Sequence, residues 1–473
     1  MSAGPTSAYA HWAATVPDRW PDALHRLANR YVFDVAACIL AGRDDPATAA
    51  VRQTVAASAA EPCDLAGGGT APAMLAALVN GTAAHALDFD DNFAPAAAHG
   101  SAVLVPALLA VAQERGLGLA AVRDAYIVGL EVMARVGRGV NPLHRRMGWH
   151  ATSTVGALGT AAGVGRLLRL EPDRMRAAIA LSYSMASGSM AQFGTQAKPL
   201  HCGLAAKAGV LSATLAAAGM EAAAEVLEGP YGMQSLMVGR DLEAHRQGPG
   251  WAGQDRPYAF DTDMDRGPLA LEAYAPLIKL WPTCGSTHTA VQAALALRQA
   301  HAHRLSEIES VHVASQRASA ANLPFATPTT AAQARFSMPF AVGVALRRGD
   351  IGLADFEPEA LRDHMASGWP GRVSTSVTPD RDDDPTVPES TVTLRFRDGA
   401  TAILGLPEAA TLGSPGYPIT DALLEAKIHS CCVPVIGAAG AEVLVEGLRA
   451  ADDRPAGALT RWFGHRPDQA APT

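Results

Sequence analysis

Apolar residues recur every three or four positions from about Trp20 to Gly219, which is the period of buried or amphipathic helices. Glycine or proline interrupts this pattern and marks the end of each segment. The segments predicted to be helical are 24–42, 72–88, 101–116, 119–136, 152–168, 172–187 and 199–219. This part of the chain therefore predicts a large all-helical domain.

One of these helices, 152–168, carries glycines at positions 156, 159 and 163. A glycine inside a helix costs about 1 kcal/mol relative to alanine. Its absent side chain, however, lets a neighbouring backbone approach closely. We therefore predict that this helix lies at the centre of the helical domain.

The period changes after about Pro268. A further helix is predicted at 287–304, and alternating or β-branched runs predict strands at 308–315, 372–379, 391–397 and 401–406. Asp398-Gly399 between the last two strands is a hairpin signal, and the acidic stretch 380–388 before them is typical of a solvated loop.

The C-terminal segment returns to a helical pattern at 420–430 and 433–449, followed by a tail from Asp452 that we expect to fray. The fold class predicted is mainly α. Residues 1–268 and 409–473 would form the helical domain, and residues 269–408 would form a smaller α+β lid domain.

Charge and composition narrow the function. The net charge of −8 and the pI near 6.0 provide no basic surface for nucleic acid. The apolar runs fall short of the roughly 20 residues that cross a bilayer, and the N-terminus has no secretory pattern. The six cysteines show no metal or disulfide spacing. We expect a cytoplasmic protein without a nucleic-acid or membrane partner.

Lysine is scarce in this chain: of 38 basic residues only four are lysines, which leaves 38 − 4 = 34 arginines. Two of the four, Lys198 and Lys207, lie close together. Pro199 favours the start of a helix, so we predict that Lys198 lies just before a helix N-terminus. A cation is unfavourable there unless an anion also binds. Lys207 is read as a structural or buried-pair lysine further along this helix.

Three histidines occupy similar positions. His99 and His150 each precede a predicted helix, and His288 falls in the first turn of another. A single histidine of this kind is more often a capping or core residue. Together with Lys198, however, they predict a site where several positive helix ends converge on a carboxylate-bearing ligand.

The run Asp88-Phe89-Asp90-Asp91 ends a predicted helix, where carboxylates oppose the helix dipole. One Asp near a histidine is suited to act as a general base or to orient one, and the structural alternative is a cap on the following turn. No histidine or cysteine spacing typical of a metal site is present, so no metal is expected. Hydrolase, phosphate-loop and dinucleotide motifs are absent as well.

These stretches resemble the MmgE/PrpD family, which includes 2-methylcitrate dehydratase, cis-aconitate decarboxylase and iminodisuccinate epimerase. The resemblance covers most of the chain in family order. The matching pieces are ALDFDDN (86–92), AHGSAVLVPALLAVAQERG (98–116), GWHATSTVGALGTAAG (148–163), FGTQAKPLHCGLAAKAG (193–209), KLWPTCGSTHTAVQAALAL (279–297) and ARFSMPFAVGVAL (334–346).

The resemblance implies a helical domain covered by a smaller α+β domain, a homodimer, and proton chemistry beside a carboxylate without cofactor or metal. It implies the catalytic residues Asp88, His99, His150 and Lys198. The substrate-binding residues expected with them are Asn92, His201, His288, Arg335 and Phe340.

Roles for the catalytic set follow from residue type. We expect His150 or Asp88 to act as the base and His99 as the acid. Lys198 and the helix ends would stabilise the enolate-like charge that develops on the substrate.

Three positions depart from the family pattern. Asn92 replaces a common threonine, Gly285 replaces a common arginine, and Phe340 replaces a common tyrosine. The loss of the arginine and the tyrosine predicts one carboxylate fewer on the substrate, which argues against methylcitrate.

The leading hypothesis is a cofactor-free dehydratase or decarboxylase acting on a small di- or tricarboxylate. The alternatives are an epimerase or isomerase of a dicarboxylate, and a non-catalytic binding protein on the same fold.

Overall fold

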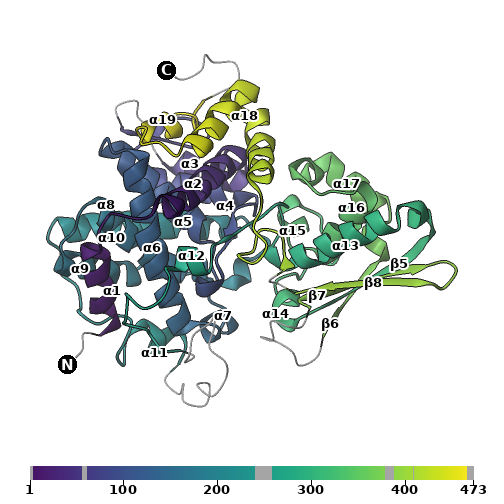
Figure 1. Ribbon diagram of the computed structural model, residues 1–473, viewed down its shortest axis with the longest axis horizontal. Coiled ribbons are helices and arrows are strands. Elements are labelled where there is room, and N and C mark those ends of the chain that lie inside the picture. The colour runs from purple at the N-terminus through teal and green to yellow at the C-terminus, as the bar shows by residue number, and fades with distance from the viewer. Residues whose placement is uncertain (1–3, 56–60, 240–257, 379–387, 408–409, 466–473) are drawn as a thin grey trace.

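The protein forms a large helical lobe and a smaller lobe that contains a β-sheet, as seen in a computed structural model (Figure 1). The structure describes all residues except 1–3, 56–60, 240–257, 379–387, 408–409 and 466–473. The main helices of the large lobe are α1 (Pro5–Thr15), α2 (Asp22–Gly42), α3 (Pro46–Thr54), α4 (Ala73–Ala86), α5 (Gly100–Glu114), α6 (Leu119–Val140), α8 (Ala151–Leu167), α9 (Pro172–Tyr183), α10 (Ala197–Ala217) and α18 (Asp421–Ala450).

Helix α8 is the centre of this lobe, as predicted from its glycines. Every residue from Ala151 to Gly165 is buried. A Cβ at Gly159 would lie 2.8 Å from the carbonyl oxygen of Gly129 in α6, and one at Gly163 would lie 3.0 Å from that of Ala125. The glycines therefore allow α6 to pack directly against the α8 backbone.

Helices α4 and α10 also pack backbone to backbone. A Cβ on Gly203 of α10 would lie 2.2 Å from the carbonyl oxygen of Leu78, and one on Gly81 of α4 would lie 3.0 Å from Cα of Gly203. This contact brings the C-terminal end of α4 against the N-terminal end of α10. The candidate site lies where these two ends meet.

The C-terminal helix α18 packs against α2 in the helical lobe. Two helices were predicted here with a break near residues 431–432, but the break lies at Gly437, whose φ is 72°. The doublet Cys431-Cys432 is buried within the helix. The tail was expected to fray from Asp452, yet it forms α19 (Gly457–Thr460) and buries Phe463, because apolar side chains there complete the core.

By length and composition alone, α10 and α18 qualify as membrane-spanning helices. Both, however, contribute side chains to the core of the helical lobe. Each also carries a buried lysine paired with an aspartate, Lys198 in α10 and Lys427 in α18. These are properties of core helices in a globular lobe.

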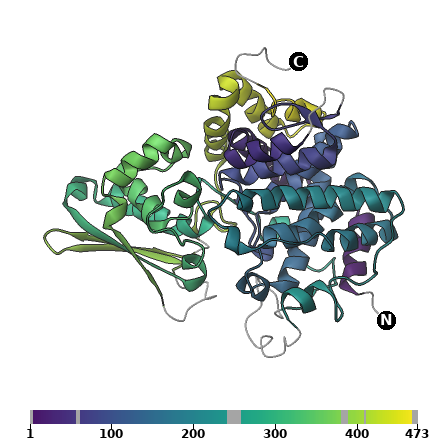
Figure 2. The same cartoon turned by 180° about the vertical axis from the view of Figure 1, so that it is seen from behind.

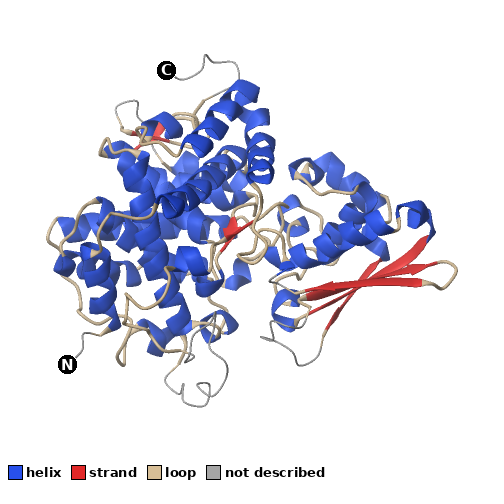
Figure 3. Cartoon of the chain, viewed as in Figure 1, coloured by secondary structure: helices blue, strands red, loops and turns tan. Residues whose placement is uncertain are grey.

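The smaller lobe is built on a four-stranded sheet of order β6-β5-β7-β8 (Figure 3). Its strands are β5 (Ile308–Ser315), β6 (Val373–Val377), β7 (Ser390–Phe396) and β8 (Thr401–Leu406), and all four were predicted to within about two residues. Strand β6 runs parallel to β5, and the other neighbours are antiparallel. The predicted Asp398-Gly399 turn joins β7 to β8, while most of the acidic loop 380–388 lies outside the described residues.

Helices cover one face of this sheet. They are α13 (His288–Ala300) and α16 (Met338–Arg348), whose apolar side chains share a core with the strands. The shorter helices of the lobe are α14 (Arg317–Ala320), α15 (Ala331–Ala334) and α17 (Pro358–Ala366). Seen from behind, the sheet lies on the side of the small lobe that faces away from the helical lobe (Figure 2).

The two lobes are joined next to the aspartate run at residues 88–91. Strand β3 (Asp91–Asn92) begins at the end of that run and pairs antiparallel with β4 (Leu277–Ile278), which leads into the small lobe. The remaining short elements are β1 (Cys63–Asp64), β2 (Thr70–Ala71), α7 (Leu143–Arg146), α11 (Met233–Met237) and α12 (Ala270–Ala273).

Several predicted boundaries were wrong. Helix α1 was not anticipated at all. Helix α6 continues to Val140, beyond the predicted end at residue 136, because Gly137 packs against Ala96 and is not a stop. Helix α10 begins at Ala197, so Lys198 lies within its first turn and not before it. Pro199 is tolerated as the third helical residue because the first N–H groups of a helix have no helical partner.

Candidate active site

The aspartate run 88–91 begins directly after the C-terminal end of α4. Asp88 has a φ of 50°, a left-handed conformation that costs a residue other than glycine about 1–2 kcal/mol. Its side chain is nonetheless buried, with 2% of the residue exposed. The contacts of that carboxylate explain why an aspartate is held in this position.

Two lysines from different lobes hold the Asp88 carboxylate. Lys198 Nζ lies 3.1 Å from Asp88 Oδ1, and Lys279 Nζ lies 2.8 Å from the same oxygen and 3.0 Å from the Asp88 carbonyl oxygen. Burial alone would raise the pKa of Asp88, but the two ammonium groups outweigh it and hold that pKa well below its usual range. Asp88 is therefore an ionised anchor and a poor proton acceptor.

His85, on the last turn of α4, links Asp90 to Lys198. Its Nδ1 lies 2.8 Å from Asp90 Oδ1 and its Nε2 lies 2.7 Å from Lys198 Nζ. The carboxylate only accepts and the ammonium only donates, so His85 is neutral with its proton on Nδ1. Both nitrogens are engaged, which leaves His85 no free atom for substrate chemistry.

His99 is the N-cap residue of α5, and its proton position is fixed as well. Nδ1 lies 2.8 Å from the Asp91 carbonyl oxygen, so the proton resides on Nδ1 and the lone pair on Nε2. Burial, with further lowering by His85, brings the pKa of His99 to about 3. His99 therefore offers Nε2 as an acceptor.

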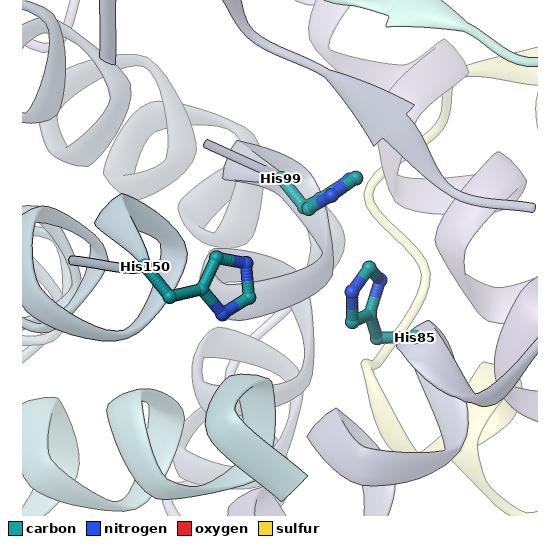
Figure 4. A group of neighbouring side chains, drawn as sticks. All are labelled: His85, His99 and His150. Atoms are coloured by element: carbon teal, nitrogen blue, oxygen red, sulfur yellow. The ribbon is translucent and has the colours of Figure 1, made fainter. Parts of the chain in front are cut away.

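His150, the N-cap residue of α8, lies near the rings of His85 and His99. Its Nδ1 lies 3.0 Å from Nδ1 of His201, and its Nε2 is buried without a hydrogen-bond partner in the described part of the chain. Figure 4 shows one ring nitrogen of His150 directed toward the gap between His85 and His99 and the other directed away. Burial and Lys198 lower the pKa of His150 well below its usual value, so the ring is neutral.

The predicted convergence is therefore present. The ring centroids of His99 and His150 lie 6.2 Å apart, and Lys198 packs over the rings of Phe193 and Phe336 next to them. Lys198 and His150 are at most 4% exposed. This places the four residues expected to be catalytic in one enclosed cluster between the lobes.

The expected roles of acid and base are not supported by this geometry. Asp88 is held ionised, and His99 presents a lone pair, so His99 is the acceptor and not the acid. His150 is the ring whose proton position no acceptor-only or donor-only partner fixes. It is therefore able to present a proton on Nε2.

The five expected substrate-binding residues differ in position. Arg335 is 6% exposed, its guanidinium stacks 5.0 Å from the Phe356 ring, and its Nε is buried without a partner among the described residues. His288 packs against Trp281, and burial with some help from Lys279 lowers its pKa to about 3. His201 contacts Nδ1 of His150, so it lies on the opposite side of that ring from Nε2.

The prediction that Phe340 binds substrate is wrong. Its side chain is fully buried between Phe356 and His364 in the apolar core of the small lobe. The aromatic ring supports the fold there and does not reach the cluster. A sequence alignment alone cannot separate this packing position from a binding position.

Asn92 lies directly against Gly285. A Cβ at Gly285 would lie 1.9 Å from the Asn92 amide nitrogen. The two departures from the family pattern are therefore linked, because Asn92 occupies the space that any side chain at residue 285 would need.

Cys284 lies just before the start of α13, but its thiol is not activated there. Burial and the nearby Asp88 raise the pKa of this thiol. Lys207 is half-buried in α10 and forms no ion pair within the described residues, so its interpretation as a buried-pair lysine is not supported.

Two groups of side chains have donor atoms close enough to hold a metal ion. They are His85, His99 and His150, and His85, Asp88, Asp90 and His99. His85 Nε2 is already engaged, however, by the Lys198 ammonium group, His85 Nδ1 by Asp90, and Asp88 Oδ1 by the ammonium groups of Lys198 and Lys279. A metal at either position would have to displace a buried cation.

Two residues of the cluster, Lys279 and His85, were missed from the sequence, and Asp90 was considered only as part of the run at residues 88–91. The scarcity of lysine was a usable signal for Lys279, as it had been for Lys198. For His85 the signal was its position three residues before Asp88 at the end of a predicted helix.

Two family models and several known proteins match this chain. A family model described as the MmgE/PrpD N-terminal domain matches residues 7–245, and one described as the MmgE/PrpD C-terminal domain matches residues 281–451. The chain is 28% identical to the cis-aconitate decarboxylase of Homo sapiens over 348 residues, which are 70% of this chain and 67% of that protein. It is 28% identical to the cis-aconitate decarboxylase of Aspergillus terreus over 363 residues, which are 72% of each protein.

Proposed function

Because the chain belongs to the MmgE/PrpD family and is a lyase of that type, we propose that it releases carbon dioxide from a small unsaturated di- or tricarboxylate. The relatives named above are cis-aconitate decarboxylases, which favours decarboxylation over dehydration. The proposal also covers a cofactor-free and metal-free reaction, a homodimeric assembly and a cytoplasmic location.

The reaction has a defined proton requirement. When a carboxylate leaves a carbon next to a C=C bond, the C–C bond breaks and its electron pair forms a new C=C bond. The far carbon of the original alkene then takes up one proton. The reaction therefore needs a cation for the remaining carboxylates and an acid at that carbon.

The observation that carries the proposal is the Lys198 ammonium beside two neutral imidazoles with free Nε2 atoms. Lys198 donates to His85 and Asp88 and retains one N–H for a substrate carboxylate. The buried Nε2 of His150 is placed to supply the proton. Nε2 of His99 is an acceptor that suits a substrate hydroxyl or a protonated carboxyl group.

The test is to incubate the protein with cis-aconitate, citrate and methylcitrate in deuterated water and to follow the products by NMR and by CO2 release. We expect CO2 from the unsaturated acid and one deuterium on the carbon that was part of the alkene. Loss of water without CO2 would support a dehydratase, and exchange of the proton alpha to a carboxylate without loss of either would support an epimerase.

A non-catalytic binding protein is the remaining alternative. It predicts that the acids bind, as measured by calorimetry, without any product or exchange. Decarboxylation would be contradicted if both the wild type and the variant Lys198→Met bound the acids equally and turned over none of them.

A further inference from the structure

Among the described residues, the hydrogen bond from His201 to the cluster is made with His150. The two Nδ1 atoms lie 3.0 Å apart and the ring centroids 5.2 Å apart. The loop after α9 closes over this pair at Gly188, whose carbonyl oxygen accepts a hydrogen bond from the His150 backbone N–H. A Cβ at Gly188 would lie 2.8 Å from Ser153 and 3.4 Å from His201 Nδ1, so a glycine is needed for this close approach.

The hydrogen bond between His150 and His201 differs from the Nδ1 hydrogen bonds of His85 and His99. In each of those rings an acceptor-only partner fixes the proton on Nδ1. Between His150 and His201 either ring can donate, so the proton has two possible positions along the same hydrogen bond.

The two rings also differ in their surroundings. His150 is 4% exposed and its Nε2 is buried beside the other site residues, whereas His201 retains 8% exposure. His201 Nε2 has no hydrogen bond to the described residues. The pair therefore extends from the enclosed cluster toward its outer edge.

We propose that His201 is the relay partner through which His150 receives the proton consumed in CO2 release, an inference that rests on the proposed function. His150 Nε2–H protonates the substrate carbon as the C–C bond breaks. His150 Nδ1 takes the proton from His201 Nδ1, and His201 Nε2 takes one from a solvent water, whose hydroxide passes into bulk solvent. One proton enters and one leaves, and exchange with solvent restores the starting tautomers after the product departs.

Electrostatics favours this two-ring transfer. The groups facing His150 are Lys198, His99, His85, His201 and the Phe193 ring. Burial and Lys198 lower the pKa of both His150 and His201. An imidazolium is thus disfavoured at either position, while a transfer in at one nitrogen and out at the other leaves each ring neutral.

The kinetic test compares His201→Ala and His201→Gln with the wild type, using cis-aconitate as the substrate. We expect kcat to fall about 10- to 100-fold while KM changes by less than about twofold, because substrate contacts remain and proton delivery is lost. Added imidazole should restore part of the His201→Ala rate, and the solvent isotope effect on kcat should rise. The matched control is His144→Gln, a buried neutral histidine bonded to Thr154 outside the cluster, which should keep wild-type kcat.

A second measurement does not need turnover. In protein labelled with 15N-histidine, a coupling through the hydrogen bond between the two Nδ1 atoms is expected in the wild type and should vanish in His201→Ala. A wild type that releases CO2 with an unchanged kcat in both His201 variants would overturn the relay. Absence of the Nδ1 coupling would also overturn it, whereas a wild type that shows the coupling but releases no CO2 would overturn the proposed function and leave the paired rings in place.

Discussion

At the scale of single residues, three of the four lysines of this arginine-rich chain bind the same short segment, residues 88–89. Lys198 and Lys279 bind the Asp88 carboxylate, and Lys427 donates to the carbonyl oxygen of Phe89 at 2.6 Å while it pairs with Asp34. Three of the four lysines are thus buried against residues 88–89. A compact ammonium with three donors fits such a crowded loop better than a planar guanidinium.

The two lysines that bind Asp88 are expected to affect different properties, Lys198 the kcat and Lys279 the thermal stability. Lys198→Met should lower kcat about 100-fold or more with a small change in thermal unfolding, because Lys279 still pairs with Asp88. Lys279→Met should lower the unfolding temperature more, because Lys279 also donates to the Asp88 carbonyl oxygen and lies 4.0 Å from Asp90, so its loss weakens two buried carboxylates, and breaking a buried pair costs about 3–5 kcal/mol. Unfolding followed by circular dichroism and steady-state kinetics measure both effects. Lys207→Met is the control and should match the wild type, and equal unfolding temperatures for the two site variants would contradict the assignment.

Asp91 predicts a pH dependence of stability. Burial and the neighbouring Asp90 raise its pKa to about 7, above an unfolded value near 3.8. The folded protein therefore binds the extra proton between these values, and its stabilising contribution is complete below about pH 4 and is lost as the pH rises through about 7. Asp91→Asn removes this dependence, and its amide oxygen still accepts from the Ser101 N–H.

The measurement is the urea midpoint of unfolding for both proteins between pH 5 and pH 8. The urea midpoint of the wild type should rise relative to that of Asp91→Asn as the pH falls. The difference between the two proteins reports the contribution of Asp91. Parallel curves would show that Asp91 has an ordinary pKa.

At this scale the sequence predicted residues whose type was unusual for the chain. Lys198 stood out among arginines, and His99 and His150 stood out at helix starts. The acid and base roles could not be predicted, because they depend on which ring nitrogen meets the Asp91 carbonyl or the His201 ring. The prediction for Phe340 was wrong for a related reason, because the residues that bury its side chain are distant in the sequence.

At the scale of secondary structure, the packing of α4 against α10 sets the site geometry. Gly203 lies five residues after Lys198, about 7.5 Å along the helix axis. Its contact with α4 therefore fixes how far the Lys198 ammonium lies from His85 and Asp88. The periodicity predicted both helices, but not that their ends meet.

Gly203→Ala tests this dependence. The added Cβ would meet the Leu78 carbonyl oxygen at 2.2 Å, and backbone cannot move aside as a side chain can. We expect a loss of about 1–3 kcal/mol or more in stability, together with a lower kcat as Lys198 moves away from His85. Leu204→Ala, the adjacent exposed position, is the matched control and should change neither. An unchanged kcat in Gly203→Ala would show that the site tolerates a shift of α10.

Strand positions were predicted well because alternation and the Asp398-Gly399 turn are local signals. Helix ends were predicted less well. Glycine at 137 was read as a stop although it is a packing residue, and Pro199 was read as a helix start although it lies in the first turn. Both depend on neighbours that a local pattern does not contain.

At the scale of the whole molecule, the enclosed cluster requires contact between the lobes. Besides Lys279, a hydrogen bond joins them: Arg145 of α7 donates to the Asn322 side-chain oxygen at 2.6 Å, and Asn322 donates to Ser286 at 2.8 Å. Ser286 lies next to the start of α13. This bond therefore helps hold the small lobe against the helical lobe.

Removing it with Asn322→Ala should favour separation of the lobes. We expect KM to rise a few-fold, corresponding to about 1 kcal/mol, with kcat largely retained. Hydrogen exchange in residues 317–323 should increase at the same time. Arg304→Ala, which removes exposed ion pairs within the small lobe only, is the control. Unchanged hydrogen exchange in Asn322→Ala would show that the bond does not hold the lobes together.

The short β3–β4 pairing has a consequence for recombining members of the family. Lys279 lies in the connecting segment, outside both the region 7–245 and the region 281–451 that match the two domain families. A chimera that joins the helical half of one protein to the lid of another at this connection inherits the cation for Asp88 from whichever parent supplies residues 277–279. The fragment that ends at residue 245 would leave Asp88 and Asp90 with one cation fewer. Exchange of lids should therefore succeed only when the parent that supplies residues 277–279 provides a cation at the position of Lys279.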